Sequence, residues 1–112
     1  MITKELGKID SVSFGLGDYQ GAMLGIHLSF SFDNGGCGYS KSSWDKNIIE
    51  HSEYCKWSES DRDKEYSEIM RYVSDLLKDA KVTTVNELKN IPVEVTLDGN
   101  TFKSFRILIE VL

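Results

Sequence analysis

Four side chains could bind a metal ion or carry out nucleophilic catalysis: His27, Cys37, His51 and Cys55. Two cysteines and two histidines match the ligand set of a structural zinc site, and a cysteine with a positioned histidine base could act as a nucleophile. The spacing favours neither chemistry, because Cys37 stands alone without a Cys-x-x-Cys motif and no characteristic pattern flanks either cysteine. The sequence therefore predicts no metal, no cofactor and no catalytic residue, with a small Cys/His-dependent enzyme as the alternative.

A glycine-rich stretch at residues 15–21 has the composition of a phosphate-binding loop. The dinucleotide fingerprint Gly-x-Gly-x-x-Gly requires a glycine where this chain has Gln20, and a helix where this chain continues with a strand pattern. We therefore interpret the stretch as a turn or bulge between two strands. In a loop that contacts a small ligand or a partner, Tyr19 and Gln20 would be the contacting side chains.

Aromatic residues give the strongest indication of function. Tyr39, Trp44, Tyr54 and Trp57 lie close together in the part of the sequence with the least regular pattern. Trp and Tyr side chains on loops are preferred binding anchors because they bury a large area at a low entropy cost. The alternative is that they cover one end of a sheet as part of the core. The candidate binding residues are Tyr19, Gln20, Tyr39, Trp44, Tyr54 and Trp57.

The first half of the chain predicts an antiparallel meander. Residues 8–14 alternate weakly, and residues 24–32 alternate strictly between apolar and small or polar side chains. Residues 33–36 have the composition of a tight turn, and residues 37–43 can return as a third strand. Residues 44–57 are expected to form a loop with no more than one helical turn.

One long amphipathic helix is expected over residues 65–81. Ser58 and Ser60 are N-cap candidates, and the acidic residues that follow them suit the positive end of a helix dipole. Its apolar stripe consists of Tyr66, Ile69, Met70, Val73, Leu76, Leu77 and Ala80. Residues 84–87 fit a capping box, which predicts a second short helix to Lys89.

The end of the chain predicts a β-hairpin. Residues 93–97 and 105–111 alternate around a turn at residues 98–100. The other face of this hairpin carries Phe102, Leu108 and Leu112. The expected fold class is α+β, in a single domain over residues 1–112. An antiparallel sheet of about five strands, an N-terminal meander plus a C-terminal hairpin, packs against one long amphipathic helix.

Charge and composition narrow the classes of function. The chain has 112 residues and a net charge of -5, which disfavours nucleic-acid binding. We expect no signal peptide and no membrane span, because the sequence has no apolar segment of the required length. The cysteines are then expected to be reduced thiols in the cytoplasm.

Several segments resemble small proteins encoded by tailed bacteriophages and prophages. The similarity covers nearly the whole chain and lies in residues 8–15, 17–20, 56–59, 76–82, 92–96, 99–100 and 106–112. Asp18 departs from the pattern, which has Gly-Gly-Tyr-Gln where this chain has Gly-Asp-Tyr-Gln. The resemblance implies a phage accessory protein in the host bacterial cytoplasm and carries no catalytic or binding residues with it.

The leading hypothesis is a non-enzymatic phage accessory protein that binds a host protein or a small signalling ligand and counters host defence. An oligomeric phage structural or assembly protein is a further alternative. We expect a homo-oligomer because the predicted hairpin has apolar residues on both faces.

Overall fold

The computed structural model describes residues 1–17, 23–44 and 59–112. They form five strands, one long helix and two short 3₁₀ helices. In chain order the elements are β1 (Ile2–Gly17), β2 (Met23–Phe32), β3 (Gly35–Trp44), α2 (Glu59–Ala80), η2 (Val85–Leu88), β4 (Pro92–Asp98), β5 (Thr101–Ile107) and η3 (Ile109–Val111). None of the helices in the described part of the chain is long and apolar enough to cross a membrane.

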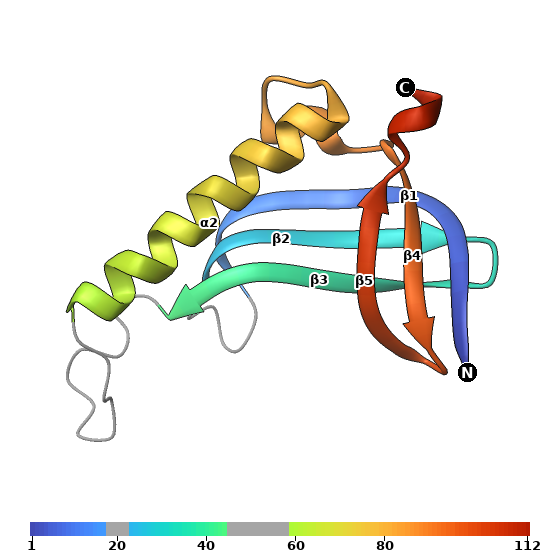
Figure 1. Cartoon of the computed structure of the whole chain (residues 1–112), viewed down its shortest axis with the longest axis horizontal. Coiled ribbons are helices and arrows are strands. Elements are labelled where there is room, and N and C mark those ends of the chain that lie inside the picture. Colours follow the sequence, from blue (N-terminus) through green and yellow to red (C-terminus); the bar gives the residue numbers. More distant parts are fainter. Residues whose placement is uncertain (18–22, 45–58) are drawn as a thin grey trace.

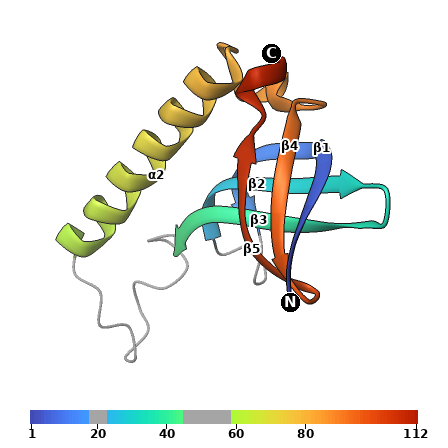
Figure 2. The same cartoon turned by 45° about the vertical axis from the view of Figure 1, so that its right-hand side comes forward.

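All five strands belong to one antiparallel sheet with the order β3-β2-β1-β4-β5. Strand β1 is long enough to pair with β4 through its first half and with β2 through its second half. Gly7 lies where the two pairings overlap, opposite both Phe32 and Val93. The sheet curls there, so that the β4–β5 hairpin crosses over the meander strands near one end (Figures 1 and 2).

Helix α2 lies toward the other end of the meander, where it packs mainly against β3 and β2 (Figure 2). The buried core lies between the curled sheet and the helix. It consists of Ile9, Ile26, Leu28, Phe30, Ile69, Val73, Leu76, Ala80, Leu88, Val93, Val95 and Ile107. The predicted fold class, a meander plus a hairpin against one long helix, is confirmed.

Aromatic rings pack between the two parts of the curled sheet, the β1–β3 meander and the β4–β5 hairpin. The Phe30 ring on β2 lies 4.6 Å from the Phe105 ring and 6.0 Å from the Phe102 ring, both on β5. The Tyr39 ring on β3 lies 5.3 Å from the Phe102 ring and 6.1 Å from the Tyr72 ring on α2. These five rings, named here the aromatic cluster, therefore connect β2, β3, β5 and α2.

The N-terminal part of the fold differs from the prediction at the glycine-rich stretch. Strand β1 continues to Gly17, so Gly15 and Gly17 are strand residues opposite Gly25 and Met23 rather than part of a turn. Hydrogen bonding to β2 keeps this glycine-rich segment extended. Residues 18–22 of the predicted connection lie outside the described residues.

Helix α2 begins earlier than predicted, at Glu59. Ser60 is therefore inside the helix and is not its N-cap, while Ser58 lies outside the described residues. The acidic residues that were expected to precede the helix lie in its first turns, where the helix dipole favours them. Met70 was assigned to the apolar stripe but is 59% exposed.

The predicted capping box at residues 84–87 forms in part, since Thr84 is the N-cap residue and backbone hydrogen bonds from Thr83 and Thr84 reach the Glu87 carboxylate. A short helix does form, as the 3₁₀ helix η2, but Thr84 makes no side-chain bond to the backbone. Instead the hydroxyls of Thr83 and Thr84 both donate to the Glu87 carboxylate, at 2.8 and 3.0 Å. The carboxylate is thereby occupied by hydroxyl donors on the turn before the helix.

The last predicted strand ends at Ile107 rather than at Val111. Asn90 N donates to Ile9 O and Ile9 N donates to Ile91 O, so the residues before Pro92 are bonded to β1 and do not extend β4. Residues 109–111 consequently have no partner strand and form η3. Ile109 and Val111, predicted to face the core, are 54% and 64% exposed.

Phe102 lies on the core side of the hairpin and not on the opposite face, as predicted. The register passes from Thr96 opposite Ser104 to Leu97 opposite Phe102, so Lys103 is an extra residue in β5. Such a bulge reverses the alternation of side chains. Phe102 therefore joins Phe105 in the aromatic cluster.

Candidate functional site

Of the six predicted binding residues, only Tyr39 has a described side chain. It is half-buried in the aromatic cluster, where its ring approaches those of Tyr72, Phe102 and Phe105. Tyr39 is therefore packed as part of the core, which is the alternative that the sequence analysis gave for these aromatic residues. The calls on Tyr19, Gln20, Tyr54, Trp57 and the side chain of Trp44 lie outside what the structure describes.

Cys37 and His27 lie on opposite faces of the β2–β3 ribbon. Cys37 is paired with Phe30 on the core side, whereas His27 is paired with Ser40 on the outer side, three residue positions away along β2. Burial raises the pKa of the Cys37 thiol, which holds it in the less reactive protonated form. His27 therefore cannot serve as the base for Cys37.

The His27 ring is held in a polar setting. One ring nitrogen lies 2.8 Å from Ser40 Oγ, and the other lies 3.1 and 3.2 Å from the carbonyl oxygens of Gly15 and Met23. Gly17 makes room for the ring, since a Cβ there would lie 2.9 Å from Nε2. Among the described residues no group of three or more His, Cys, Asp and Glu side chains could hold a metal ion. The other predicted zinc candidates, His51 and Cys55, lie outside those residues.

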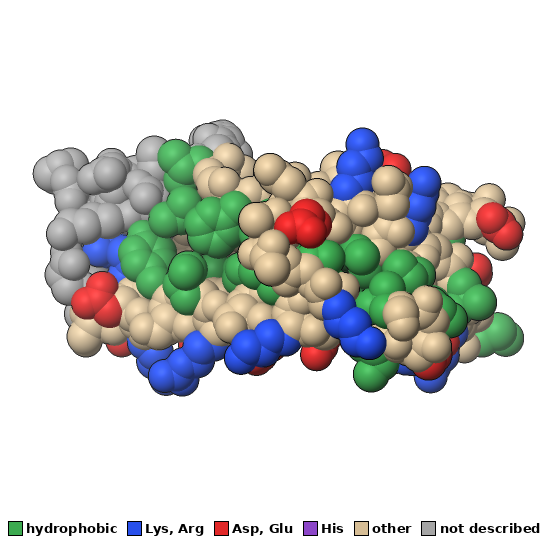
Figure 3. Space-filling view, turned by 90° about the horizontal axis from the view of Figure 1, so that it is seen from above, with side chains coloured by type: hydrophobic (Ala, Val, Ile, Leu, Met, Phe, Trp, Pro, Cys, Tyr) green, Lys and Arg blue, Asp and Glu red, His purple; other side chains and the backbone are tan. Residues whose placement is uncertain are grey.

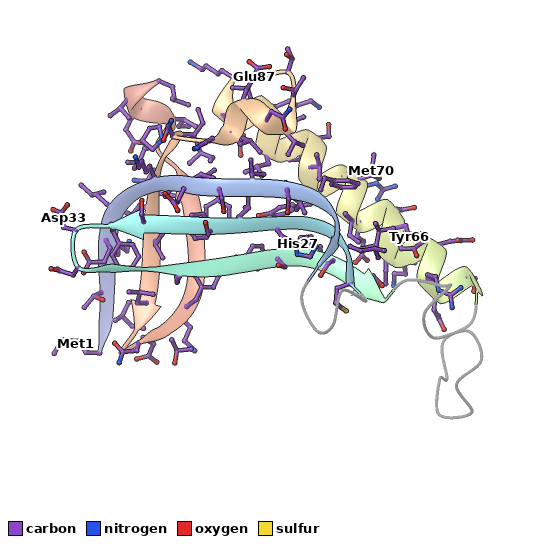
Figure 4. All side chains as sticks on the ribbon, turned by 180° about the vertical axis from the view of Figure 1, so that it is seen from behind. Met1, His27, Asp33, Tyr66, Met70 and Glu87 are labelled. Carbon is purple, nitrogen blue, oxygen red and sulfur yellow. The ribbon has the colours of Figure 1, made fainter. Side chains whose placement is uncertain are left out.

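The outer face of the meander carries small polar side chains around His27 (Figure 4). Its serines and glycines follow from the alternation of side chains along β2 and along the parts of β1 and β3 paired with it, because the residues between them lie on the core face. Ser11 Oγ and Ser29 Oγ are 2.5 Å apart, so these hydroxyls hydrogen-bond to each other. Around His27 the described side chains on this face are therefore small and polar.

A groove lies between α2 and β5, named here the α2–β5 groove. Its larger hollow has a volume of about 350 Å³ and its smaller hollow about 160 Å³. Tyr72 and Phe105 line both hollows. The larger one is further lined by Asp75, Leu76, Asp79, Arg106, Ile107 and Ile109. In Figure 1 the C-terminal half of α2 and the end of β5 converge around this position.

Charged residues on the two sides of the α2–β5 groove differ in their pairing. On β5, Arg106 donates to Glu94 and to Glu110, each at 3.1 Å. These bonds raise the pKa of Arg106, and the bond from Arg106 lowers the pKa of Glu110. On α2, Asp75 and Asp79 make no ion pair with any described residue. The helix side of the groove therefore has two carboxylates available to a ligand.

The apolar floor of the groove includes a partly buried tyrosine. Burial, together with the neighbouring Tyr39, raises the pKa of Tyr72, so its hydroxyl stays protonated in the physiological range. With Phe105 and Leu76 it offers aromatic and aliphatic contact area. A ligand with both an apolar group and a cationic group would match this lining.

Exposed apolar side chains also gather in places on the face that Figure 3 shows from above. Large exposed apolar residues of the fold include Phe14 and Leu16 on β1, 48% and 56% exposed, and Met70 on α2. Phe14 and Leu16 share one face of β1 because they are two residues apart. Their exposed side chains therefore form a second apolar surface.

Sequence reasoning missed the α2–β5 groove. One signal was present, since Tyr72, Asp75, Leu76 and Asp79 have the three- and four-residue spacing of one helix face. The opposite wall could not be deduced, because it depends on the curl that brings β5 beside α2.

Comparisons of the chain with protein families, with curated proteins and with solved structures find no match. The groove geometry and the resemblance to phage proteins are therefore the grounds for a functional proposal.

Proposed function

We propose that this protein is a non-enzymatic accessory protein of a bacteriophage or prophage that binds a host protein, in order to counter host defence. The α2–β5 groove carries the binding part of the proposal, because it combines aromatic and aliphatic contact area with two carboxylates that no described residue pairs. The phage part is supported by the sequence resemblance alone. A small signalling ligand is the alternative occupant.

The groove has features typical of recognition sites. Protein interfaces depend on a few large apolar or aromatic side chains within a polar rim. Tyr72, Phe105 and Ile109 supply such contacts, and Ile109 is 54% exposed at the rim. The predicted anchors at Tyr19, Gln20, Trp44, Tyr54 and Trp57 lie outside the side chains that the structure describes, so the proposal for the groove does not depend on them.

A matched pair of substitutions in η3 tests the binding role. Ile109 lines the groove, while Val111 is similarly exposed in the same short helix without lining it. We expect a tagged wild-type chain to retain a host protein from bacterial lysate, Val111→Glu to retain it equally, and Ile109→Glu to lose it. Proteins retained on the resin are identified by mass spectrometry.

The outcome separates the alternatives. Retention of the same host protein by Ile109→Glu would show that the groove is not the binding surface, and Trp57→Ala then tests the predicted aromatic anchors. No retained protein, together with a nucleotide-sized mass excess in native mass spectrometry, would replace the host protein with a small ligand.

An assembly role is the second candidate, favoured by the open sheet. Strands β3 and β5 are the two terminal strands of the sheet order, so each pairs with a single strand among the described residues. Unpaired strand edges can bind a second copy of the same chain. Size-exclusion chromatography with light scattering at micromolar concentration would give an oligomer if this role is correct, and a monomer throughout would exclude it.

The enzyme alternative can be tested at Cys37. Because burial raises the pKa of this thiol, we expect it to react more slowly with iodoacetamide at neutral pH than the same cysteine in the urea-unfolded chain. The Cys55→Ser variant leaves Cys37 as the only thiol. Reaction of the folded chain faster than the unfolded chain would favour an activated nucleophile.

A further inference from the structure

We propose that the α2–β5 groove binds an extended basic segment of a partner protein. An apolar side chain of that segment lies against Tyr72, Phe105 and Ile109, and a neighbouring Lys or Arg pairs with Asp75 and Asp79. This inference rests on the proposed binding function and specifies the chemistry of the partner.

The shape of the groove favours a stretch of polypeptide. The two hollows share Tyr72 and Phe105, and their β5 lining extends from Phe102 to Ile107. The site is therefore elongated along one strand rather than closed around a compact ligand. The larger hollow, about 350 Å³, can hold the apolar side chain.

The charge of the groove favours a basic segment. Asp75 and Asp79 are four residues apart on one face of α2, so a single cationic side chain can reach both. On the opposite wall of the larger hollow, Arg106 is already bonded to Glu94 and Glu110, while the second cation of β5 in the groove, Lys103, lines the smaller hollow. Carboxylates thus outnumber cations at this end, and a Lys or Arg would complement them.

The backbone of β5 favours an extended conformation for that segment. Leu108 N donates to Pro92 O, which makes this a hydrogen-bonded pair of the β4–β5 ladder. In an antiparallel ladder such pairs alternate with non-hydrogen-bonded pairs, so Phe105, opposite Val95, directs its N–H and C=O away from β4. These groups face the unpaired edge of β5, where an extended chain can bond to them.

A second copy of this chain fits the groove less well. Each copy carries a net charge of -5, so two copies repel each other at long range. The partner predicted by charge complementarity is instead a different protein with a locally basic, apolar sequence.

A displayed library of random twelve-residue peptides tests the proposal. The full-length chain is the bait, and peptides that it enriches are synthesised with a fluorescent label for anisotropy titrations. We expect the enriched sequences to combine a large apolar residue with a nearby Lys or Arg. Because the pairs are exposed, raising the salt concentration should weaken binding.

Two charge-matched double variants identify the carboxylates. Asp75→Asn with Asp79→Asn should weaken binding of the enriched peptide about tenfold, the scale expected for two exposed charge pairs. Asp10→Asn with Asp33→Asn removes the same charge at exposed positions away from the groove and should leave the affinity unchanged. Equal melting temperatures of the variants would show that the fold is intact.

Three results would overturn the inference: no enrichment of basic peptides, equal affinity for both double variants, or amide NMR shifts from the bound peptide outside α2 and β5. A dimer of the chain that Ile109→Glu dissociates would replace the basic segment with a second copy. A host protein that Ile109→Glu fails to retain, found without any basic peptide in the library, would leave the proposed function standing and overturn the inference alone.

Discussion

Phe30 on β2 is the residue of the meander that packs against two rings of the β4–β5 hairpin. It is 2% exposed, and its ring approaches those of Phe102 and Phe105 across the core. Removing the ring would leave a cavity between β2 and β5, since neither backbone can close it without uncurling the sheet. We expect Phe30→Ala to lower the free energy of unfolding by about 3–5 kcal/mol, measured by urea denaturation.

Phe14 provides the matched control for this substitution. It is a phenylalanine on the neighbouring strand, but it is 48% exposed. We expect Phe14→Ala to lower the free energy of unfolding by about 1 kcal/mol, because much less apolar area is lost from the core. Similar losses for both substitutions would contradict the central role assigned to the aromatic cluster.

Glu87 makes a local contribution that depends on pH. Hydrogen bonds from Thr83 and Thr84 lower the pKa of its carboxyl in the folded chain. A lowered pKa stabilises the fold above the ordinary glutamate pKa, and this stabilisation is lost as the pH falls through the folded value. We expect the double variant Thr83→Val, Thr84→Val to return the pKa of Glu87 toward the ordinary glutamate range, in an NMR titration of its carboxyl carbon.

Thr101→Val is the control for that titration. Thr101 is exposed at the start of β5 and makes no contact with Glu87 among the described hydrogen bonds. It should leave the pKa of Glu87 unchanged. An unchanged pKa in the Thr83, Thr84 variant would show that the two hydroxyls do not hold the carboxylate in solution.

Strand β1 has a tightly packed glycine where its two pairings overlap. Gly7 is opposite both Phe32 and Val93, and a Cβ at this position would collide with the carbonyl oxygen of Ser31 and lie 3.0 Å from the Phe32 Cβ. We expect Gly7→Ala to lower the free energy of unfolding by about 1–3 kcal/mol, because the backbones must move apart. Urea denaturation measures this, with exposed Lys8→Ala as the neutral comparison.

The elements themselves follow largely from local patterns. Alternation in residues 24–32 predicted the core face of β2, and the three- and four-residue spacing of Ile69, Val73, Leu76 and Ala80 predicted the buried face of α2. Their ends were less well predicted. The ends of β5 and α2 depend on which neighbours are available, and a partner strand far away in the sequence leaves no local signal.

At the scale of the whole molecule, the aromatic cluster should make the hairpin and the meander unfold together. Opening the β4–β5 hairpin would expose the rings of Phe30 and Tyr39, which contact Phe102. We expect the slowest amides of β2 and β5 to exchange with free energies that agree within about 1 kcal/mol, measured by native-state hydrogen exchange in increasing urea. A hairpin that exchanges at a clearly lower free energy would show that it opens as a separate unit.

The sequence by itself determined the fold class: its apolar residues recur with the period of a strand or a helix, and Asn and Gly mark the turns. The spacing of Tyr72, Asp75 and Asp79 also places them on one face of α2, although the sequence analysis did not identify them as candidates. These are local properties, because each depends on residues within a few positions of one another.

Only the tertiary structure decided how the elements meet. The curl at Gly7 places β5 beside α2, and the bulge at Lys103 turns Phe102 into the core. The α2–β5 groove depends on the pairing of β1 with β4, which joins residues more than eighty positions apart, such as Thr3 and Leu97. The free energy that stabilises this pairing comes from packing across the whole molecule. The local pattern of residues along the chain therefore does not predict it.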